Sequence, residues 1–173
     1  MKRFLLIILS LFILSNISFA QKRQLPASCR NILDKNFRGW QMAEVSSEIQ
    51  KFLRQNNSRN NSGNFLVGDW NGDGKQDYAV LIRHGFETLN DGTKLPRNVS
   101  VTFVSGGKDF KYFVLDTFGD YIALDKKGKT AYDYETKSRI KFSNDAVFVG
   151  IWEKGGSSYV WRKDKFIYFI TSD

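Results

Sequence analysis

The sequence predicts an α+β fold, mostly β, in which one or two N-terminal helices pack on an antiparallel β-meander. Two observations lead to this prediction. Helical periodicity is confined to the residues before position 56, where apolar side chains recur at i, i+4, i+7 and i+8. After position 64, short apolar runs with a period of two are separated by turn residues. Short strands that follow one or two leading helices are typical of an antiparallel sheet covered by helix.

The N-terminal segment has the three parts of a secretory signal peptide. Lys2 and Arg3 are basic and are followed by the almost wholly apolar residues 4–14. Residues 18–20, Ser-Phe-Ala, then place small side chains where a signal peptidase cleaves. The apolar run is shorter than the roughly 20 residues that span a bilayer, which disfavours an uncleaved membrane anchor. The sequence therefore predicts a signal peptide at residues 1–20 and an exported protein, periplasmic or extracellular, with no transmembrane span in the mature chain.

Cys29 is the only cysteine of the chain, so no internal disulfide is expected. A lipid anchor at this residue is disfavoured, because a lipidated cysteine directly follows the apolar core and residues 21–24 intervene here. We expect Cys29 to be a small buried residue or an idle thiol, with an intermolecular disulfide as the alternative.

Residues 21–173 have the size of one ordinary domain, and no long Pro-, Gly- or Ser-rich linker divides them. The net charge of +8 falls to +6 when Lys2 and Arg3 are removed. A basic exported protein meets anionic surfaces such as phospholipid, wall polymer or acidic glycan. The Lys and Arg residues are scattered and form no nucleic-acid-binding motif, so no nucleic-acid partner is expected. The expected partner is an envelope protein or a glycan, and the domain is expected to be a monomer.

Two stretches have helical patterns. Residues 26–35 predict a short first helix, and Pro26 suits its first turn. Ser46 is placed to cap a second helix, and residues 56–64 after it are polar and predict a loop. The second helix is predicted by one apolar stripe, which contains Val45, Ile49, Phe52 and Leu53.

Strands are predicted mainly after residue 64. Residues 37–42 are also expected to be extended, with Trp40 and Met42 on one face. The turn pairs Asp91-Gly92, Gly106-Gly107 and Gly155-Gly156 separate several strands. The predicted strands are residues 65–67, 78–82, 99–103, 110–115, 121–124, 131–134, 139–142, 146–152, 158–161 and 166–170.

The most specific pattern lies between the first two of these strands. Side chains with oxygen atoms occupy positions 1, 3, 5 and 9 of a tight loop, and Gly74 stands at position 6, where a sharp bend needs a positive φ. The backbone carbonyl of Lys75, at position 7, adds another oxygen. Ca²⁺ takes roughly 6–8 oxygen ligands, whereas zinc and copper prefer sulfur or imidazole. The loop therefore predicts a calcium site at residues 69–77, with side-chain ligands Asp69, Asn71, Asp73 and Asp77.

Two other interpretations of this loop are weaker. An EF-hand has a bidentate Glu at position 12 and is flanked by helices, whereas position 12 is Val80 here and both flanks are strand-like. A plain β-hairpin turn is favoured by one Asp-Gly or Asn-Gly pair. Such a turn does not require acidic or amide residues at four spaced positions, so metal binding is the favoured prediction.

Residues 68–80, Gly-Asp-Trp-Asn-Gly-Asp-Gly-Lys-Gln-Asp-Tyr-Ala-Val, resemble the calcium loop of FG-GAP and VCBS-type repeats. Those repeats read Asp-x-Asn/Asp-x-Asp-Gly-x-x-Asp before an apolar strand. The chain contains no second copy of the loop, so a closed propeller is not expected. The wider layout also resembles small exported bacterial proteins of unassigned function. The resemblance covers residues 63–82 and implies that the calcium ligands are Asp69, Asn71, Asp73, Lys75 through its carbonyl, and Asp77.

Candidates for catalysis are less specific. His84 is the only histidine, and no Gly-x-Ser-x-Gly elbow is present, so we interpret it as a polar residue at a strand edge. Two opposed carboxylates can hydrolyse glycosides, and the candidates are Asp116, Asp120, Asp125, Asp133 and Glu135. The late aromatic residues form either a sugar-stacking platform or, as we favour, part of the core; they are Trp152, Tyr159, Trp161 and Tyr168.

Three functions remain open. The leading hypothesis is an exported non-enzymatic domain, stabilised by one calcium ion, that serves as a binding or interaction module in the cell envelope. The second is a carboxylate-dependent hydrolase of wall or sugar polymers, and the third is a purely structural domain. The sequence pattern contains no nucleophile–base pair, which favours the first and third.

Overall fold

The computed structural model of the chain describes residues 25–56 and 62–172. These residues form two α-helices and eleven β-strands, and all the strand pairs among them are antiparallel. The prediction of a mostly β, α+β fold is therefore confirmed. The predicted signal peptide and the middle of the predicted loop at residues 56–64 lie outside the described residues.

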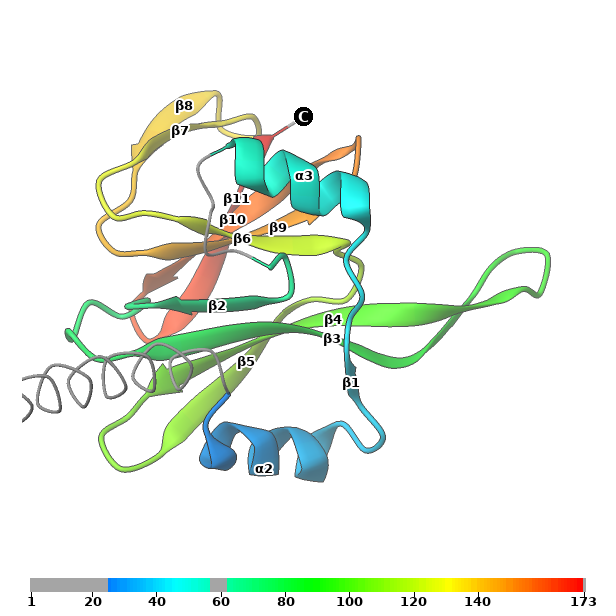
Figure 1. The fold of residues 1–173 in the computed structure, drawn as a ribbon. Helices are drawn as coiled ribbons and strands as arrows, with labels where there is room; N and C mark the ends of the chain where they lie inside the picture. Colours follow the sequence, from blue (N-terminus) through cyan, green and yellow to red (C-terminus); the bar gives the residue numbers. More distant parts are fainter. Residues whose placement is uncertain (1–24, 57–61, 173) are drawn as a thin grey trace, which may run out of the picture.

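The strands form two stacked sheets and a separate hairpin (Figure 1). Sheet A contains β1 (Gln41–Met42), β2 (Phe65–Gly68), β3 (Asp77–Thr88), β4 (Lys94–Ser105) and β5 (Phe110–Asp116). Its order is β1-β3-β4-β5, and β2 also pairs with β3. Sheet B has the order β11-β10-β9-β6. Its members are β6 (Tyr121–Asp125), β9 (Ala146–Ile151), β10 (Gly155–Arg162) and β11 (Lys165–Ser172), and the hairpin consists of β7 (Thr130–Asp133) and β8 (Ser138–Lys141).

The main hydrophobic core lies between sheets A and B. Leu81 of β3 faces sheet B and belongs to the same buried cluster as Ile122 of β6. Val80, the preceding residue, points the other way and packs beneath helix α2 (Ala27–Asn36). Successive side chains of a strand point to opposite faces, so a strand that is covered on both faces reads as a continuous apolar run. This explains why residues 78–82 show no alternation.

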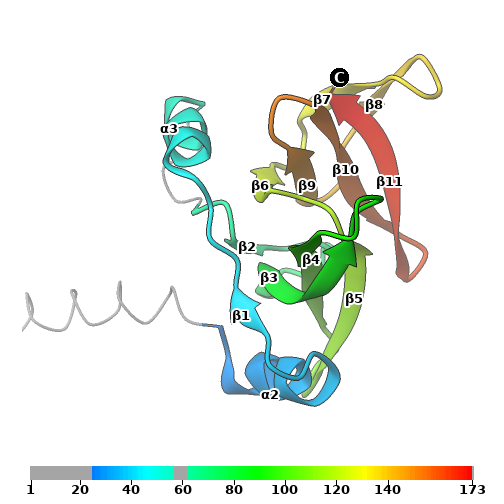
Figure 2. The same cartoon turned by 90° about the vertical axis from the view of Figure 1, so that its right-hand side faces the viewer.

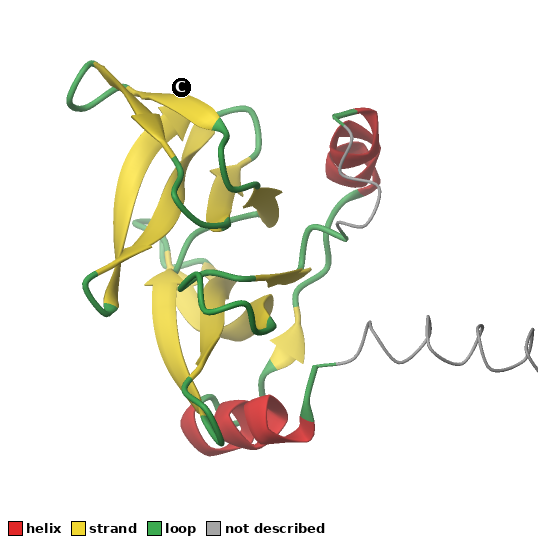
Figure 3. Cartoon of the chain, turned by 90° about the vertical axis from the view of Figure 1, so that its left-hand side faces the viewer, coloured by secondary structure: helices red, strands yellow, loops and turns green. Residues whose placement is uncertain are grey.

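The two helices cover opposite sides of the stacked sheets (Figure 3). Pro26 precedes α2, in agreement with the sequence prediction, and Cys29 and Leu33 bury one face of this helix against sheet A. Helix α3 (Ser47–Gln55) packs on the outer face of sheet B at β6 and β9. Its first turn is capped by Ser46, whose Oγ accepts a hydrogen bond from the Ile49 amide at 3.3 Å.

Sheets A and B meet again at the edge strand β5. The Phe113 ring lies 5.2 Å from the Trp161 ring and 5.6 Å from the Phe166 ring, edge to face in both cases. Figure 2 shows the turn between β10 and β11 coming down beside β5. The packing of these three partly buried aromatic side chains holds the two sheets together at this end.

Strands β3 and β4 continue well beyond the predicted residues 78–82 and 99–103 and form a long projecting hairpin (Figure 1). The outer residues 85–96 are exposed, and Phe86 is 66 % exposed. Asp91-Gly92 is the turn, as the sequence predicts, and the Asp91 carboxylate accepts a hydrogen bond from the Thr93 amide at 2.9 Å. The sequence predicts shorter strands here because the exposed outer part of the hairpin does not contribute apolar residues to a core.

Three local predictions are wrong. Gly155-Gly156 is not a turn but the start of β10, and the turn occupies residues 152–154. A Cβ atom at Gly156 would lie 2.4 Å from the Val149 carbonyl oxygen, so this glycine permits close strand approach. The predicted extended stretch at 37–42 is shorter, because residues 37–39 form a bend and a turn and β1 contains only Gln41–Met42. Phe52 is not fully within the core stripe of α3, because it is 40 % exposed.

Candidate functional site

The predicted calcium loop connects β2 to β3. Gly68 at the end of β2 pairs with Asp77 at the start of β3, so the ends of the loop are held together by the sheet. Both flanks are strands, which agrees with the sequence argument against an EF-hand. Gly72 and Gly74 have φ values of 78° and 79°, the left-handed region that favours glycine. The predicted positive φ at Gly74 is therefore confirmed.

Asp69 turns its carboxylate toward the inside of the loop. Its Oδ1 accepts a hydrogen bond from the Gly72 amide at 2.8 Å, and its Oδ2 accepts one from the Gly74 amide at 3.0 Å. Charge-assisted hydrogen bonds of this kind are stronger than neutral ones. The first predicted ligand thus organises the loop by binding its own backbone.

Asn71 and Asp73 continue this pattern. The Asn71 side-chain oxygen accepts a hydrogen bond from the Asp73 amide at 3.0 Å, and the Asp73 carboxylate accepts one from the Lys75 amide at 2.9 Å. The second bond is the main reason why the pKa of Asp73 is lowered. The Lys75 ammonium lies 3.7 Å from the same carboxylate, but both groups are exposed to solvent and such a pair contributes little stability.

Asp77 differs from the other predicted ligands because it is fully buried. Its Oδ2 accepts a hydrogen bond from the Trp70 amide at 2.8 Å, and its Oδ1 accepts one from the Ser105 amide of β4 at 2.7 Å. Burial raises the pKa of Asp77, and the negative charge of Asp73 raises it further, whereas the backbone amides of Ser105, Trp70 and Asn71 lower it. Asp77 therefore joins the loop to sheet A while it repels Asp73.

Trp70 anchors the loop in the core. Its side chain is completely buried among the residues between the two sheets, and the ring lies over Gly68. A Cβ atom at Gly68 would be 2.3 Å from the ring, so no larger residue fits there without movement. The sequence pattern did not single out Trp70, because an isolated tryptophan inside a polar loop has no apolar periodicity around it.

Two residues that the sequence pattern missed reach the loop from the segment just before β9. Asn144 donates a hydrogen bond from Nδ2 to the Trp70 carbonyl at 3.2 Å, and the Asp145 carboxylate accepts one from the Asp69 amide at 3.4 Å. The Asn144 side-chain oxygen also lies over Gly72, 2.7 Å from the position that a Cβ atom would occupy. No local spacing signals these contacts, because the partners are more than 70 positions apart in the sequence.

The chemistry of these groups fits calcium. The donors are carboxylate, amide and carbonyl oxygens, which hard cations prefer. Among the described residues, no three His, Cys, Asp or Glu side chains come together as a metal-holding group. A cation at this loop would therefore need the Asn71 amide and Lys75 carbonyl oxygens in addition to the aspartates.

Among the described residues, no hydrogen bond, ion pair or ring contact joins His84 to a carboxylate of the loop. Its ring meets the Phe37 ring of the α2 end at 5.5 Å, edge to face. It stands at the irregularity where the β3–β4 pairing shifts between Arg83 and Phe86. The sequence predicts a polar residue at the edge of a strand, but β3 continues to Thr88 and His84 lies within it.

The carboxylates considered for hydrolysis are engaged at separate strand ends. Asp116 accepts a hydrogen bond from the Tyr159 hydroxyl at 2.9 Å, and Asp120 accepts one from the Trp152 amide at 2.9 Å. Asp125 is bound to Ser158 and Lys129. Asp133 accepts hydrogen bonds from the Glu135 amide and from Thr136. None of the hydrogen bonds or ion pairs among the described residues joins two of these carboxylates.

The late aromatic residues do not form one platform. Trp161 and Tyr159 pack in or against the core between the sheets, in agreement with the favoured prediction. Trp152 lies on the other side of sheet B, where its ring meets Phe52 of α3 at 5.5 Å. Tyr168 is 56 % exposed.

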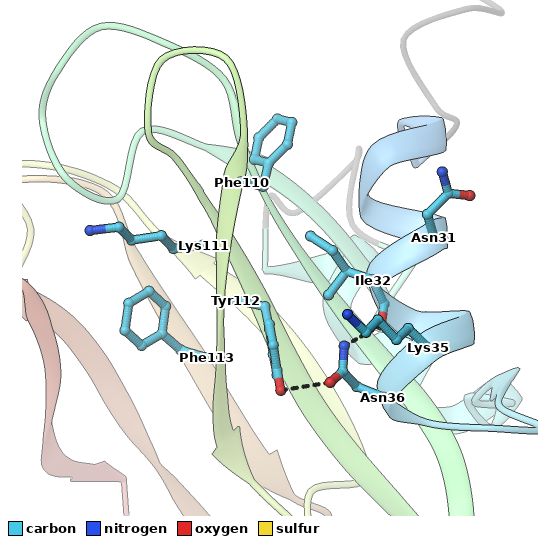
Figure 4. A pocket seen from close by; sticks show the side chains of 8 residues that line it. All are labelled: Asn31, Ile32, Lys35, Asn36, Phe110, Lys111, Tyr112 and Phe113. Atoms are coloured by element: carbon cyan, nitrogen blue, oxygen red, sulfur yellow. Dashed lines mark hydrogen bonds between the residues drawn. The ribbon is translucent and has the colours of Figure 1, made fainter.

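A groove of about 660 Å³ lies between α2 and β5 (Figure 4). Ligand pockets usually have volumes of about 300–1,000 Å³, so the groove is large enough for several side chains. The sequence pattern did not predict it, because its two walls are far apart along the chain. Its lining residues are Asn31, Ile32, Lys35, Asn36, Phe110, Lys111, Tyr112 and Phe113.

Comparison of the chain with protein-family models, with curated proteins and with solved structures finds no match. The resemblance of the loop to FG-GAP and VCBS-type repeats therefore stays a prediction that rests on the loop motif. In the described part of the chain, no helix has the length and apolar character needed to cross a membrane.

Proposed function

We propose that this chain is an exported, non-enzymatic binding domain whose fold is stabilised by one calcium ion in the 69–77 loop. The observation that carries the proposal is the arrangement of the loop's oxygens. The side chains of Asp69, Asn71 and Asp73 accept hydrogen bonds from amides within the same tight loop. Asp77 reaches the amide of the second loop residue, Trp70, from its buried position.

These hydrogen bonds leave the oxygens able to bind a cation. A carboxylate or amide oxygen has two lone pairs, and one amide donor occupies only one of them. The proposed ligands are Asp69, Asn71, Asp73 and Asp77 through their side chains and Lys75 through its carbonyl. A bound calcium ion supplies positive charge, which offsets the repulsion between the carboxylates of Asp73 and Asp77.

The position of the loop supports a stabilising role. Asp77 holds it to β4 of sheet A through the Ser105 amide. Asn144 and Asp145 hold it to the segment just before β9 of sheet B. A cation that rigidifies this junction stabilises the stacking of the sheets and any surface built on them. We propose that the partner of this surface is a protein or glycan of the cell envelope and that the domain acts as a monomer.

The calcium part of the proposal is tested by thermal unfolding with calcium and with chelator. At free calcium of about 100 times Kd, stabilisation is about 2.7 kcal/mol, which corresponds to a rise in Tm of roughly 5–10 °C for a domain of this size. Asp73→Ala should abolish the rise. Asp91→Ala is the matched control, because it removes an equivalent bond to the Thr93 amide outside the loop and should keep the rise.

The refuting result is an unchanged Tm together with no calcium detected by titration calorimetry. A purely structural role for the domain predicts the same calcium effect, so this experiment does not separate it from a binding role. Those two roles differ in whether the folded domain binds a partner at all.

A further inference from the structure

Strand β5 is the last strand of sheet A among the described residues, and the part of it beside α2 has no strand paired to its outer edge. β5 pairs with β4 on one side, and no described strand pairs with its other side. An unpaired strand edge presents a row of backbone N–H and C=O groups that can pair with another chain. Proteins usually protect such an edge with charged residues, proline or a bulge. In β5 the pairing with β4 is irregular only near the C-terminal end, between Val114 and Asp116, whereas residues 110–113 pair regularly and include one Lys among aromatic residues.

The groove beside α2 follows this open edge. Its β5 wall consists of the four consecutive residues 110–113. Consecutive side chains of a strand point to opposite faces, so a groove that touches all four of them borders the edge of the strand and not one face alone. Figure 4 shows Tyr112 between β5 and α2, and Lys111 and Phe113 on the other side of the strand.

One hydrogen bond joins the two walls of the groove, and a second one within α2 holds the Asn36 side chain in place. The Tyr112 hydroxyl donates to the Asn36 side-chain oxygen at 3.2 Å, and Asn36 Nδ2 donates to the Ile32 carbonyl at 2.7 Å. The Tyr112 ring also meets the Phe37 ring at 6.0 Å. The groove is therefore preformed, which lowers the entropy cost of binding.

The charged groups of the groove all have the same sign. Lys35 on α2 and Lys111 on β5 line it, and no Asp or Glu does. Neither lysine takes part in an ion pair among the described residues. A partner with carboxylates near its ends would supply the missing charges, and apolar side chains between them would pack on Ile32 and Phe110.

We propose that the groove binds an extended acidic peptide segment of a partner protein, which adds to the free edge of β5 as a further strand. This inference rests on the proposed binding role of the domain, but not on calcium. A second copy of this chain is a poorer occupant, because both copies would bring the Lys111 side chain to the shared edge and each chain without residues 1–20 carries a net charge of +6 (+8 less Lys2 and Arg3).

The test uses synthetic peptides of about six residues, in which valine and threonine alternate and a glutamate stands near each end. One control peptide has lysine in place of glutamate, and another has N-methylated amides on one edge. The readout is amide hydrogen exchange by NMR. At glutamate peptide of about ten times Kd, alternate amides of β5 should exchange about tenfold more slowly, since about one protein molecule in eleven stays free. The control peptides should leave them unchanged.

Charge reversal tests the role of the lysines. The double variant Lys35→Glu with Lys111→Glu should lose binding of the glutamate peptide and gain binding of the lysine peptide. The matched control is the double variant Lys127→Glu with Lys141→Glu, which changes the net charge by the same amount at two exposed positions that do not line the groove. This control should bind the glutamate peptide as the unchanged protein does.

Three results would overturn the inference. The first is equal binding of the glutamate and lysine peptides. The second is no protection of the β5 amides at about 1 mM peptide, which limits the binding free energy to less than about 4 kcal/mol. The third is the formation of concentration-dependent dimers that protect the β5 amides without peptide. The last result would identify a second copy as the occupant. If the peptide fails while the calcium rise in Tm persists, this inference alone is wrong. If β5 is protected but calcium has no effect, only the metal part of the proposed function is wrong.

Discussion

Replacement of Asp77 by alanine separates the backbone role of the loop from its metal role. The substitution removes the acceptors of two amides, those of Trp70 and Ser105, at a position with no solvent exposure. Leaving a buried donor unsatisfied costs about 1–3 kcal/mol, so the two together should lower the free energy of unfolding by about 2–6 kcal/mol. That is a large part of the roughly 5–15 kcal/mol that stabilises an ordinary domain.

The comparison variant is Asn71→Ala, measured by urea unfolding in the presence of chelator. Asn71 accepts one hydrogen bond from the exposed Asp73 amide, and water can replace that acceptor. Its loss should therefore cost at most about 1 kcal/mol without calcium. Asp77→Asn should be intermediate, because the amide offers one acceptor oxygen where the carboxylate offers two.

The reasoning is refuted if Asp77→Ala unfolds within about 1 kcal/mol of the unchanged protein in chelator, or if Asn71→Ala is equally destabilised. When the same curves are measured with calcium, both variants should lose the stabilisation that the metal adds. Asp77→Ala should then lose both the stability of its backbone hydrogen bonds and the stability that calcium adds. Asn71→Ala should lose mainly the stability that calcium adds.

Two further predictions concern the core. Gly68→Ala places a Cβ atom against the Trp70 ring and should lower the free energy of unfolding by about 1–3 kcal/mol through overpacking. Gly92→Ala, in an open turn at φ 84°, should lower it by about 1 kcal/mol through backbone strain alone. Equal losses of stability for the two variants in urea unfolding would contradict this. Burial raises the pKa of the Cys29 thiol from 9.0 to about 12. Between pH 9 and about 12 the unfolded thiol loses its proton while the folded thiol keeps it. The stability that the thiol contributes is therefore complete below pH 9 and declines as the pH rises toward about 12. Over this range the equilibrium constant of unfolding should increase by close to tenfold per pH unit. Cys29→Ala should remove that part of the pH dependence, and the native thiol should react with Ellman's reagent only on unfolding; a fast native reaction at pH 8 would show that the thiol is accessible.

The parts of the loop that were predictable from the sequence depend on residues a few positions apart. Asp69, Asn71 and Asp73 bind amides two to five positions along the chain, and Gly74 bends where the pattern requires it. The Ser46 cap of α3 is a similar local feature. Side chains and amides this close in the chain meet whenever the local backbone adopts the turn.

The assignment of strands to sheets was not predictable in this way. Val80 and Leu81 are both apolar, but one packs under α2 and the other against sheet B. Their destinations depend on the register of β3 with its neighbours, which in turn depends on the volume of the whole core. The projecting part of the β3–β4 hairpin is not predictable from apolar periodicity either, because its residues contribute little to any core.

By itself the sequence determined a mostly β chain with two early helices and a tight, oxygen-rich loop at residues 69–77. Only the tertiary structure decided that Asp77 is buried against Ser105, that Asn144 and Asp145 reach the loop from just before β9, and that no described strand pairs with the outer edge of β5 beside α2. The difference is physical. Hydrogen bonds within the loop need only the geometry of a few residues, whereas contacts between segments more than 70 positions apart form only when burial of the core compensates the entropy lost in bringing them together.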